Sequence, residues 1–367
     1  MRSSEGTYYV GLDHVRALAA FLVVAWHFSH WGPNYPVPLN HSPFLGPIDE
    51  GHVGVSIFMT LSGYLFAKLI GDRKIRYLPF LWNRAIRLLP LLTVVLYLYA
   101  AQRKLEWGPY LVQVAKGVIF PTLPNAGWSI TIELHFYLLM PLLLAIIRPR
   151  PKFVLFLIAA SIASRLALYL AGFDIQSLAY ETILGRFDQF AFGIAAYRLR
   201  DHIDGKVALS ALALLWGGYA VFDWMGGYYH FPTPSVWILL PTLEGLAIAP
   251  MIAWYDRNPI QGRGMWLVGK AGEYSYSIYL LHFFAVAQAA AFIDEHVMRM
   301  PDLVHALPWA MLFFLGMVAV GHASWRLIEE PPLRWRKPYF AEKESKAPEY
   351  RAHVAPDADA PNEVLAR

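Results

Sequence analysis

The sequence of 367 residues contains no cysteine and is poor in charge, since only 16% of its residues are Asp, Glu, Lys or Arg. The lack of cysteine excludes disulfide bonds, thiolate catalysis and cysteine-ligated metal sites. Soluble domains usually carry about 25% charged residues. The formal net charge is only +4, and the basic residues are scattered among apolar segments. Nucleic-acid binding requires a basic face, so this class of protein is disfavoured.

Hydrophobic residues are abundant. They make up 57% of the chain, aromatic residues make up 15%, and the mean hydropathy is +0.37. Trp and Tyr favour the boundary between membrane and water, and the 13 Trp residues fit such a surface. The alternative is one very large soluble core, but single cores stop growing near about 250–300 residues. The composition therefore predicts an integral membrane protein.

Ten apolar segments are long enough for membrane-spanning helices, each of which needs about 20 residues. They are residues 12–30, 51–71, 84–101, 129–147, 153–171, 183–199, 207–224, 235–255, 273–293 and 307–328. The third and sixth are the weakest, and 110–121 is a candidate for an extra short or re-entrant piece. The first segment is too long for a cleavable signal peptide and lacks a small-residue cleavage site. The predicted fold class is all-α: a polytopic membrane bundle of about ten helices.

The connections between these segments alternate in charge. With the N-terminus inside, the inner connections carry most of the basic residues, such as the group at 73–76. The outer connections 31–50, 172–182 and 223–234 have no Lys or Arg, and 102–128 is an exception with three. Cytoplasmic connections carry the excess of Lys and Arg, so both termini are expected in the cytoplasm.

The end of the chain differs in composition from the rest. Residues 338–367 are polar and rich in Pro, Ala, Glu and Asp. Such a segment cannot bury enough apolar surface to fold. The predicted division is a membrane domain at 1–337 and a disordered cytoplasmic tail at 338–367, with no internal repeat and no second folded domain.

Two ionisable residues in the first segment have an informative spacing. Arg16 and His27 are eleven positions apart, which on a helix corresponds to about 16.5 Å and three turns plus about 20°. The two side chains therefore share a face, and Asp13 lies one turn before Arg16, where it can pair with it. Arg16 alone can be explained as a cation that extends to the headgroups, and His27 as a packed interfacial residue. Their common face favours a polar path through the bundle, because ionisable residues within spans often mark function.

Six motifs, in order along the chain, resemble the acyltransferase 3 family of membrane O-acyltransferases. They are "GLDHVRALAAFLVVAWH" (11–27), "VGVSIFMTLSGYLF" (53–66), "NRAIRLLP" (83–90), "GWSITIELHFYLLMPLLL" (127–144), "YSYSIYLLH" (274–282) and "IEEPP" (328–332). The resemblance extends from about residue 11 to 334. The chain departs from the family pattern at Leu134 and His135, where many members have an acidic residue and Gln, and at His14, which is often Gly. These departures concern the acceptor contacts rather than the fold.

The resemblance implies transfer of an acyl group from cytoplasmic acyl-CoA to an acceptor hydroxyl, usually on a sugar outside the cytoplasm. Expected partners are acyl-CoA (acetyl-CoA foremost), a carbohydrate or lipid-linked glycan, and membrane lipid, in a bacterial cytoplasmic (inner) membrane. A hydroxyl that attacks a thioester must lose its proton, and imidazole is the usual base near neutral pH. His27 is the candidate base. Glu133, in preference to Asp188, is the candidate that orients its ring.

The phosphates of the donor require cations. Arg recognises phosphate through a planar, permanently charged fork. Arg84 and Arg87 are three residues apart, so they share a helix face at the predicted cytoplasmic boundary. Together with Arg16 they are the predicted coenzyme A-binding residues, although anchoring at the inner membrane face also explains them. The distance from Arg16 to His27 is on the scale of an extended pantetheine arm.

Other polar residues within the segments have two interpretations each. Trp128 and Ser129 begin the fourth segment, where Ser129 either caps the helix or contacts the acceptor. Asp188 either forms a buried ion pair with the nearby Arg186 or takes part in the reaction. His282 either packs or participates in catalysis. No compact set of metal ligands is visible, so no metal is expected.

Other functions remain open at this point. A transporter of a small polar solute would also carry polar residues within its spans, but no repeated half with broken helices is visible. A non-catalytic scaffold leaves the Arg16–His27 face without an explanation. Within the enzyme class, the acceptor could be a small lipophilic molecule and the donor succinyl-CoA.

Overall fold

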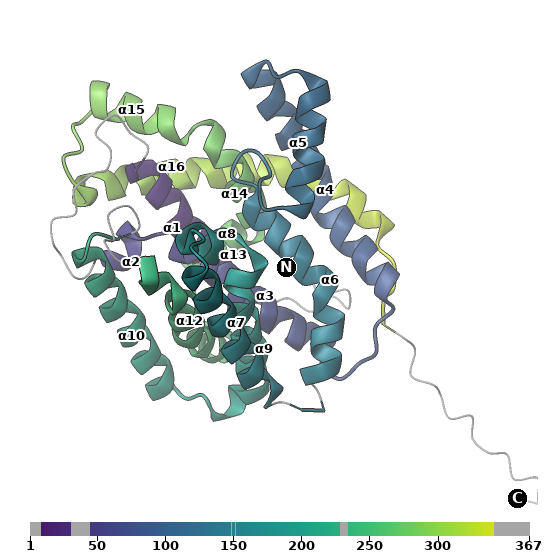
Figure 1. Ribbon diagram of the computed structural model, residues 1–367. Coiled ribbons are helices and arrows are strands. Elements are labelled where there is room, and N and C mark those ends of the chain that lie inside the picture. The colour runs from purple at the N-terminus through teal and green to yellow at the C-terminus, as the bar shows by residue number, and fades with distance from the viewer. Residues whose placement is uncertain (1–8, 31–44, 148, 151, 228–233, 341–367) are drawn as a thin grey trace, which may run out of the picture.

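The computed structural model describes residues 9–30, 45–147, 149–150, 152–227 and 234–340 (Figure 1). Within these ranges the chain is helical, and the β contact found there is an isolated bridge between Ile75 and Phe340. The α-helices are α1 (Val10–His30), α2 (Gly46–Asp49), α3 (Val53–Ile70), α4 (Tyr77–Arg103), α5 (Trp107–Ile119), α6 (Trp128–Ile147), α7 (Phe153–Leu170), α8 (Ile175–Glu181), α9 (Ile183–Leu199), α10 (Gly205–Trp224), α12 (Leu240–Arg257), α13 (Arg263–Glu273), α14 (Ser275–Leu281), α15 (Val286–His296) and α16 (Leu303–Ser324). The predicted all-α class is confirmed.

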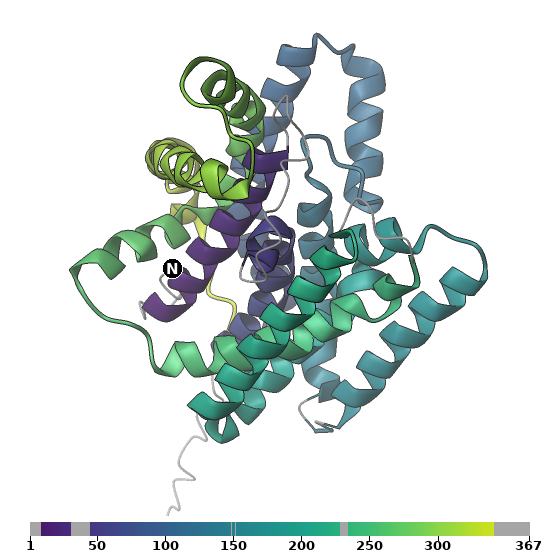
Figure 2. The ribbon, with the colours of Figure 1, turned by 90° about the vertical axis from the view of Figure 1, so that its left-hand side faces the viewer.

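Helices α1 and α3 form the centre of the bundle. In its most apolar stretch α3 is 78% buried and α1 is 67% buried, whereas α7 is only 17% buried. Figure 2 shows α1, in purple, between the C-terminal helices on one side and the teal helices α7 to α10 on the other. A polar side chain on α1 or α3 is therefore enclosed by protein rather than exposed at the surface of the bundle.

Two glycines allow α3 and α9 to cross at very short distance. A Cβ atom at Gly63 would lie 2.1 Å from the carbonyl oxygen of Phe190, and one at Gly193 would lie 2.0 Å from that of Thr60. Each helix thus places a glycine against the backbone of the other. Small residues at such crossings are a common feature of helix pairs in membranes, because they let the backbones approach.

Seven helices of the described chain are long and apolar enough to span a membrane, and the number rises to eight if one bent pair is a single span. Helices α9 and α12 lie at the positions of the predicted segments 183–199 and 235–255, but they are not among the seven. The predicted number of about ten spans is therefore not confirmed. The sidedness of the two termini rests on the distribution of Lys and Arg and stays a prediction.

The bent pair lies near the end of the chain. The turn His282–Phe284 separates α14 from α15, and the two halves meet at an angle of 60°. The predicted segment 273–293 thus exists as a broken helix. His282, one of the sequence candidates, lies in the turn just before the bend, which follows Phe284.

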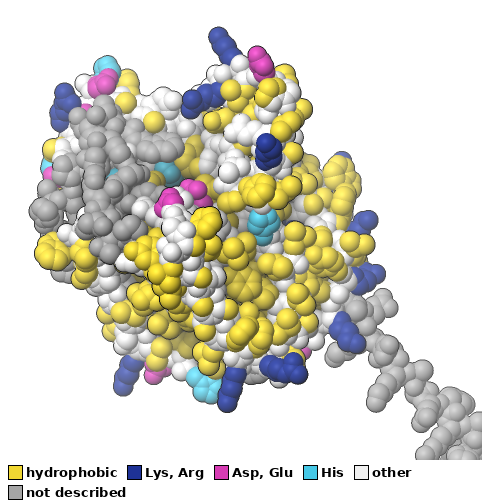
Figure 3. Space-filling model, in the orientation of Figure 1, with side chains coloured by type: hydrophobic (Ala, Val, Ile, Leu, Met, Phe, Trp, Pro, Cys, Tyr) yellow, Lys and Arg dark blue, Asp and Glu magenta, His cyan; other side chains and the backbone are white. Residues whose placement is uncertain are grey.

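The outer surface of the bundle is strongly apolar. Large hydrophobic side chains are exposed on the peripheral helices, for example Leu155 and Phe156 on α7 and Leu209 on α10. Figure 3 shows this wide hydrophobic surface, with Lys and Arg side chains mainly at its edges. Helix α5 and the end of α4 project from the bundle at the top of Figure 1, and Trp107 and Ile119 are exposed there. These surfaces and the apolar helices are those of a multi-pass membrane protein.

The predicted tail begins at residue 338, but Tyr339 and Phe340 are at least partly buried. Tyr339 is only 3% exposed, and its ring meets that of Phe80 with the centroids 5.7 Å apart. Residues 341–367 lie outside the described residues. The membrane domain thus includes Tyr339 and Phe340, because their apolar rings find a place beside the start of α4.

Candidate functional site

A cavity opens between α1, α3, α4, α6 and α14. It holds about 860 Å³ of space, open solvent at its mouth included. Its polar lining consists of Arg16, Ser62, Arg84, Arg87, Ser129, Glu133, Tyr137, Ser275, Tyr276 and Tyr279. The three arginines, the glutamate and the serine that the sequence singles out therefore meet in one cavity.

Arg16 is held by a carboxylate on its own helix. Its Nη1 atom donates a hydrogen bond of 2.8 Å to Oδ1 of Asp13, which is fully buried. Residues three apart on a helix face each other, which is the pairing expected from the sequence. The contact fixes the direction of the guanidinium group that lines the cavity.

Arg84 and Arg87 reach the cavity from α4. Arg87 lies 3.6 Å from Oε2 of Glu329 and 4.7 Å from the ring centre of Trp325. Arg84 lies instead over the ring of Phe66, at 5.2 Å. In the described part of the chain, the buried Nε atom of Arg84 meets no hydrogen-bond acceptor. Arg84 is therefore a cation with donor capacity for an anion that enters the cavity.

Glu133 faces these cations from α6. Arg16, Arg84 and Arg87 all act on its carboxylate electrostatically, and the hydroxyl of Tyr137 donates a hydrogen bond to it. Tyr137 lies one helical turn further along α6, so the pair is local and does not depend on another helix. The carboxylate gives the cavity one negative group among three positive ones.

Ser129 and Trp128, adjacent in sequence, have different surroundings. The Oγ atom of Ser129 donates a hydrogen bond of 2.8 Å to the hydroxyl of Tyr279, and both residues line the cavity. The ring of Trp128 packs instead against Tyr180 of α8, with the centroids 4.8 Å apart. Successive residues on a helix point in different directions, so only Ser129 contributes to the cavity wall.

His27 meets a second histidine rather than Glu133. The Nδ1 atom of His27 lies 2.8 Å from the carbonyl oxygen of Val23 and 3.2 Å from Nε2 of His282. His282 is fully buried, and its own Nδ1 lies 3.0 Å from the carbonyl oxygen of Ile278. Sequence reasoning includes His282 as a candidate but gives no signal of this contact, because no spacing relates residues on different helices.

These contacts determine where the ring protons are. A carbonyl oxygen only accepts, so Nδ1 of both histidines carries the hydrogen. Nε2 of His282 then holds a lone pair and accepts from Nδ1–H of His27, which is shared with Val23. The lone pair of His27 is accordingly on Nε2. The arrangement resembles a base whose other nitrogen is held by an orienting acceptor.

The histidine pair borders the cavity without lining it. Tyr279, which lines the cavity, precedes His282 by three residues, and their rings are 6.1 Å apart. His27 is absent from the described cavity wall. The cavity therefore extends from the arginines to the immediate neighbour of the pair.

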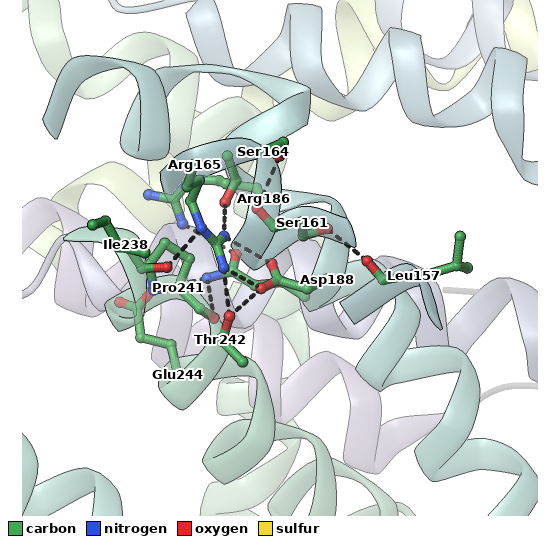
Figure 4. Close-up of polar contacts among 12 residues, drawn as sticks. Leu157, Ser161, Ser164, Arg165, Arg186, Asp188, Ile238, Pro241, Thr242 and Glu244 are labelled. Carbon is green, nitrogen blue, oxygen red and sulfur yellow. Dashed lines mark hydrogen bonds and ion pairs between the residues drawn. The ribbon is translucent and has the colours of Figure 1, made fainter. Parts of the chain in front are cut away.

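Asp188 is bound in an ion pair with Arg165, and both side chains are fully buried (Figure 4). Nη2 of Arg165 lies 2.7 Å from Oδ2 of Asp188, and further Arg165 nitrogens donate to the carbonyl oxygens of Gly185 and Ile238. The hydroxyl of Thr242 also donates to Asp188. These contacts join α7, α9 and α12, so Asp188 serves the packing of the bundle.

The buried ion pair considered for Asp188 is present, but its partner is Arg165 and not the nearby Arg186. Residues two apart on a helix point away from each other, so Arg186 faces another set of partners. It donates to the carbonyl oxygen of Tyr180 and, at 2.8 Å, to Oγ of Ser56. Arg165, the true partner of Asp188, was missed because one cation inside an apolar run gives no indication of what it meets.

Among the described residues, no group of three or more His, Asp or Glu side chains is arranged so that it could hold a metal ion. The described contacts instead supply cations, a histidine pair and hydroxyl groups.

The sequence is similar to known membrane acyltransferases. The family model of the acyltransferase domain of the acyltransferase 3 family matches residues 9–325. A protein of Komagataeibacter xylinus named "Putative membrane-bound transacylase BcsY" is 26% identical over 322 residues, which cover 78% of this chain and 75% of that protein. A Staphylococcus aureus protein named "Putative O-acetyltransferase" is 24% identical, over 91% of this chain and 60% of its own length. This chain thus spans about three fifths of that relative. No solved structure matches the chain.

Proposed function

The chain belongs to the acyltransferase 3 family and is an O-acyltransferase, and we propose that it transfers an acetyl group from cytoplasmic acetyl-CoA to a hydroxyl of an envelope or exported glycan. The reaction takes place in the bacterial cytoplasmic membrane. The single observation that carries the proposal is the cavity. It collects Arg16, Arg84 and Arg87 and extends to Tyr279, beside the histidine pair.

The donor lies along this cavity with its phosphates at the arginines. Arg84 and Arg87 are on the first half of α4, which the charge pattern assigns to the cytoplasmic side. Guanidinium groups bind phosphate through paired, charge-assisted hydrogen bonds. Asp13 positions Arg16 and Glu329 positions Arg87, because each carboxylate lies beside the guanidinium group that lines the cavity. Nothing in this arrangement needs a metal.

His27 is the general base. Its Nε2 lone pair accepts the proton of the acceptor hydroxyl as the hydroxyl oxygen attacks the thioester carbonyl carbon. The carbon–sulfur bond then breaks, and the coenzyme A thiolate takes the proton back from the imidazolium. The new ester and free coenzyme A are the products, so atoms and charge balance. His282 stabilises the imidazolium, because its Nε2 accepts from Nδ1–H of His27.

The acceptor enters from the opposite end of the cavity, near Ser129. The hydroxyl groups of Ser129 and Tyr279 and the carboxylate of Glu133 are hydrogen-bonding groups suited to a sugar. These residues supply the donors and acceptors that a small apolar acceptor would not use.

The test is the acetyl content of surface glycans in a strain that lacks the gene. Complementation with the wild type should restore a mass increment that mild base removes, and His27→Ala should not restore it at equal protein level. His296→Ala is the matched control, since His296 is exposed and stacks on Phe292. Full acetylation with His27→Ala would exclude His27 as the base. Wild-type protein that transfers no label from labelled acetyl-CoA to any glycan would contradict the proposed reaction.

A further inference from the structure

The chain that follows the last helix is fastened to the start of α4. The indole Nε1 of Trp82 donates to the carbonyl oxygen of Trp335, at 2.9 Å. Asn83 makes two bonds to Lys337: its Nδ2 donates to the carbonyl oxygen at 2.7 Å, and its Oδ1 accepts from the backbone nitrogen at 2.8 Å. Arg336 lies between these anchored residues, so its backbone is fixed on both sides beside Asn83.

The fastening continues to the end of the described chain. Arg76 donates from its side chain to the carbonyl oxygen of Pro338, at 2.6 Å, and from its backbone to that of Tyr339, at 2.7 Å. Ile75 and Phe340 then form a β-bridge. Residues 335–340, which we name the C-terminal clasp, are therefore a structured part of the bundle. They cover the beginning of the helix that carries Arg84 and Arg87.

The clasp holds a further cation near Arg84 and Arg87, which line the cavity. Arg336 is half-buried, and its main-chain neighbours are bonded to the two residues that precede Arg84. Burial, together with the charges of Arg84 and Arg87, lowers the pKa of Arg336 to about 10. Like charges held together in a partly desolvated place repel each other. Such a cluster is stabilised when an anion binds between its members.

We propose that Arg336 is a fourth anion-binding residue of the donor site and that it takes the 3′-phosphate of the coenzyme A nucleotide. The inference rests on the proposed function, since it assigns a residue to the same donor. The 3′-phosphate is chosen because of the order in which the relevant residues follow one another along α4. Asn83, which fixes the clasp, comes first, and Arg84 and Arg87, which line the cavity, follow it. The cavity also reaches Tyr279, whose ring lies beside that of His282. The 3′-phosphate is likewise the phosphate at the end of the molecule remote from the thioester.

The test compares two donors with the full-length protein in lipid vesicles. Acetyl-CoA and 3′-dephospho-acetyl-CoA differ only in the phosphate assigned to Arg336. The wild type should have a KM about tenfold or more lower for acetyl-CoA, as expected for a lost charge-assisted hydrogen bond. Arg336→Gln should raise the KM for acetyl-CoA to that of the dephospho donor and leave kcat unchanged. Arg336→Lys should recover part of the preference.

Arg334→Gln is the matched control, because it removes an exposed guanidinium two residues away. It should leave both KM values unchanged. A wild-type protein that uses both donors equally would overturn the inference without any variant. So would an Arg336→Gln protein in which KM rises equally for both donors, because that result means only a loosened clasp.

The failure of the inference and that of the proposed function are distinguishable. If the wild type transfers acetyl groups but shows no preference for the 3′-phosphate, only the assignment of Arg336 is wrong. If the wild type transfers nothing, the proposed function is wrong, and binding of coenzyme A itself still tests the site. Wild-type binding that is about tenfold tighter than that of Arg336→Gln supports the assignment, and equal binding overturns it.

Discussion

Nε2 of His282 lies 3.2 Å from Nδ1 of His27, although the two residues are 255 positions apart in the sequence. Each ring is also bonded to the carbonyl oxygen four residues before it, on its own helix. Both rings are thereby fixed in orientation before any substrate binds. Preorganised groups of this kind act without the cost of reorganisation at the moment of reaction.

Replacing His282 should therefore affect the chemical step and not the binding of the donor. His282→Phe removes the acceptor of the His27 hydrogen bond, and we expect kcat to fall about 10- to 100-fold. This fall corresponds to an increase of about 1.4 to 2.8 kcal/mol in the activation free energy. The KM for acetyl-CoA should stay unchanged. His282→Gln keeps an acceptor and should recover part of the rate. A normal kcat for His282→Phe would mean that the contact only packs the helices.

The ion pair of Arg165 and Asp188 predicts a pattern of stability. Arg165→Met leaves a buried carboxylate without its cation, and we expect a loss of about 3–5 kcal/mol, measured as a lower midpoint of thermal unfolding in detergent. Asp188→Leu should cost a similar amount. The double variant should be more stable than either single one, because neither charge is then isolated. Two single variants as stable as the wild type would contradict a structural role for the pair.

The crossing of α3 and α9 predicts a steric effect. Gly193→Ala places a methyl group 2.0 Å from the carbonyl oxygen of Thr60, so the helices must separate. We expect a lower thermal midpoint and less folded protein in the membrane. Gly218→Ala on α10 is the control, since its Cβ would have no atom within 4 Å and alanine favours helix. If Gly193→Ala and Gly218→Ala have the same thermal midpoint, the close crossing of α3 and α9 does not contribute to stability in this way.

Asp49 predicts how stability depends on pH. Burial and the neighbouring carboxylates of Asp223 and Glu50 raise the pKa of Asp49 from 3.8 to about 8. Between these two values the folded protein keeps a proton that the unfolded chain releases. Stability therefore falls as pH rises through this range, by at most about 1.4 kcal/mol per pH unit for one proton, and is unaffected by this group above it.

Asp49→Asn removes the titrating group and should make the curve flatter over the same range. The measurement is the thermal midpoint of the two proteins at a series of pH values. A wild type that gains stability with rising pH relative to Asp49→Asn would show that the carboxyl is ionised in the folded state.

The parts of the site that lie on one helix could be predicted from the sequence. Asp13 pairs with Arg16, and Arg84 and Arg87 reach the same cavity, because three-residue spacings fix a common face. Contacts between helices could not be predicted in this way. The approach of His282 to His27 depends on how α14 packs against α1, which no local pattern specifies.

The same distinction between features of one helix and contacts between helices applies to the fold. Apolar runs locate the helices correctly, since each predicted segment coincides with a helix or a broken one. The number of spans does not follow from the apolar runs in the same way. Helix α9, for example, contains Arg186 and Asp188, whose partners are on other helices. The two charged residues lower the local hydropathy of the segment, but hydropathy does not show the partners on other helices that stabilise the buried charges.

The break between α14 and α15 determines which part of the molecule holds the His282 ring beside His27. The His282 ring is bonded to Ile278, which belongs to α14, and the chain bends only after Phe284. A shift of α15 relative to its surroundings would therefore turn the chain after Phe284 and leave the ring in place. Changes in bilayer thickness act on the exposed face of α15, whereas the contact of His282 with His27 depends on the short helix before the bend.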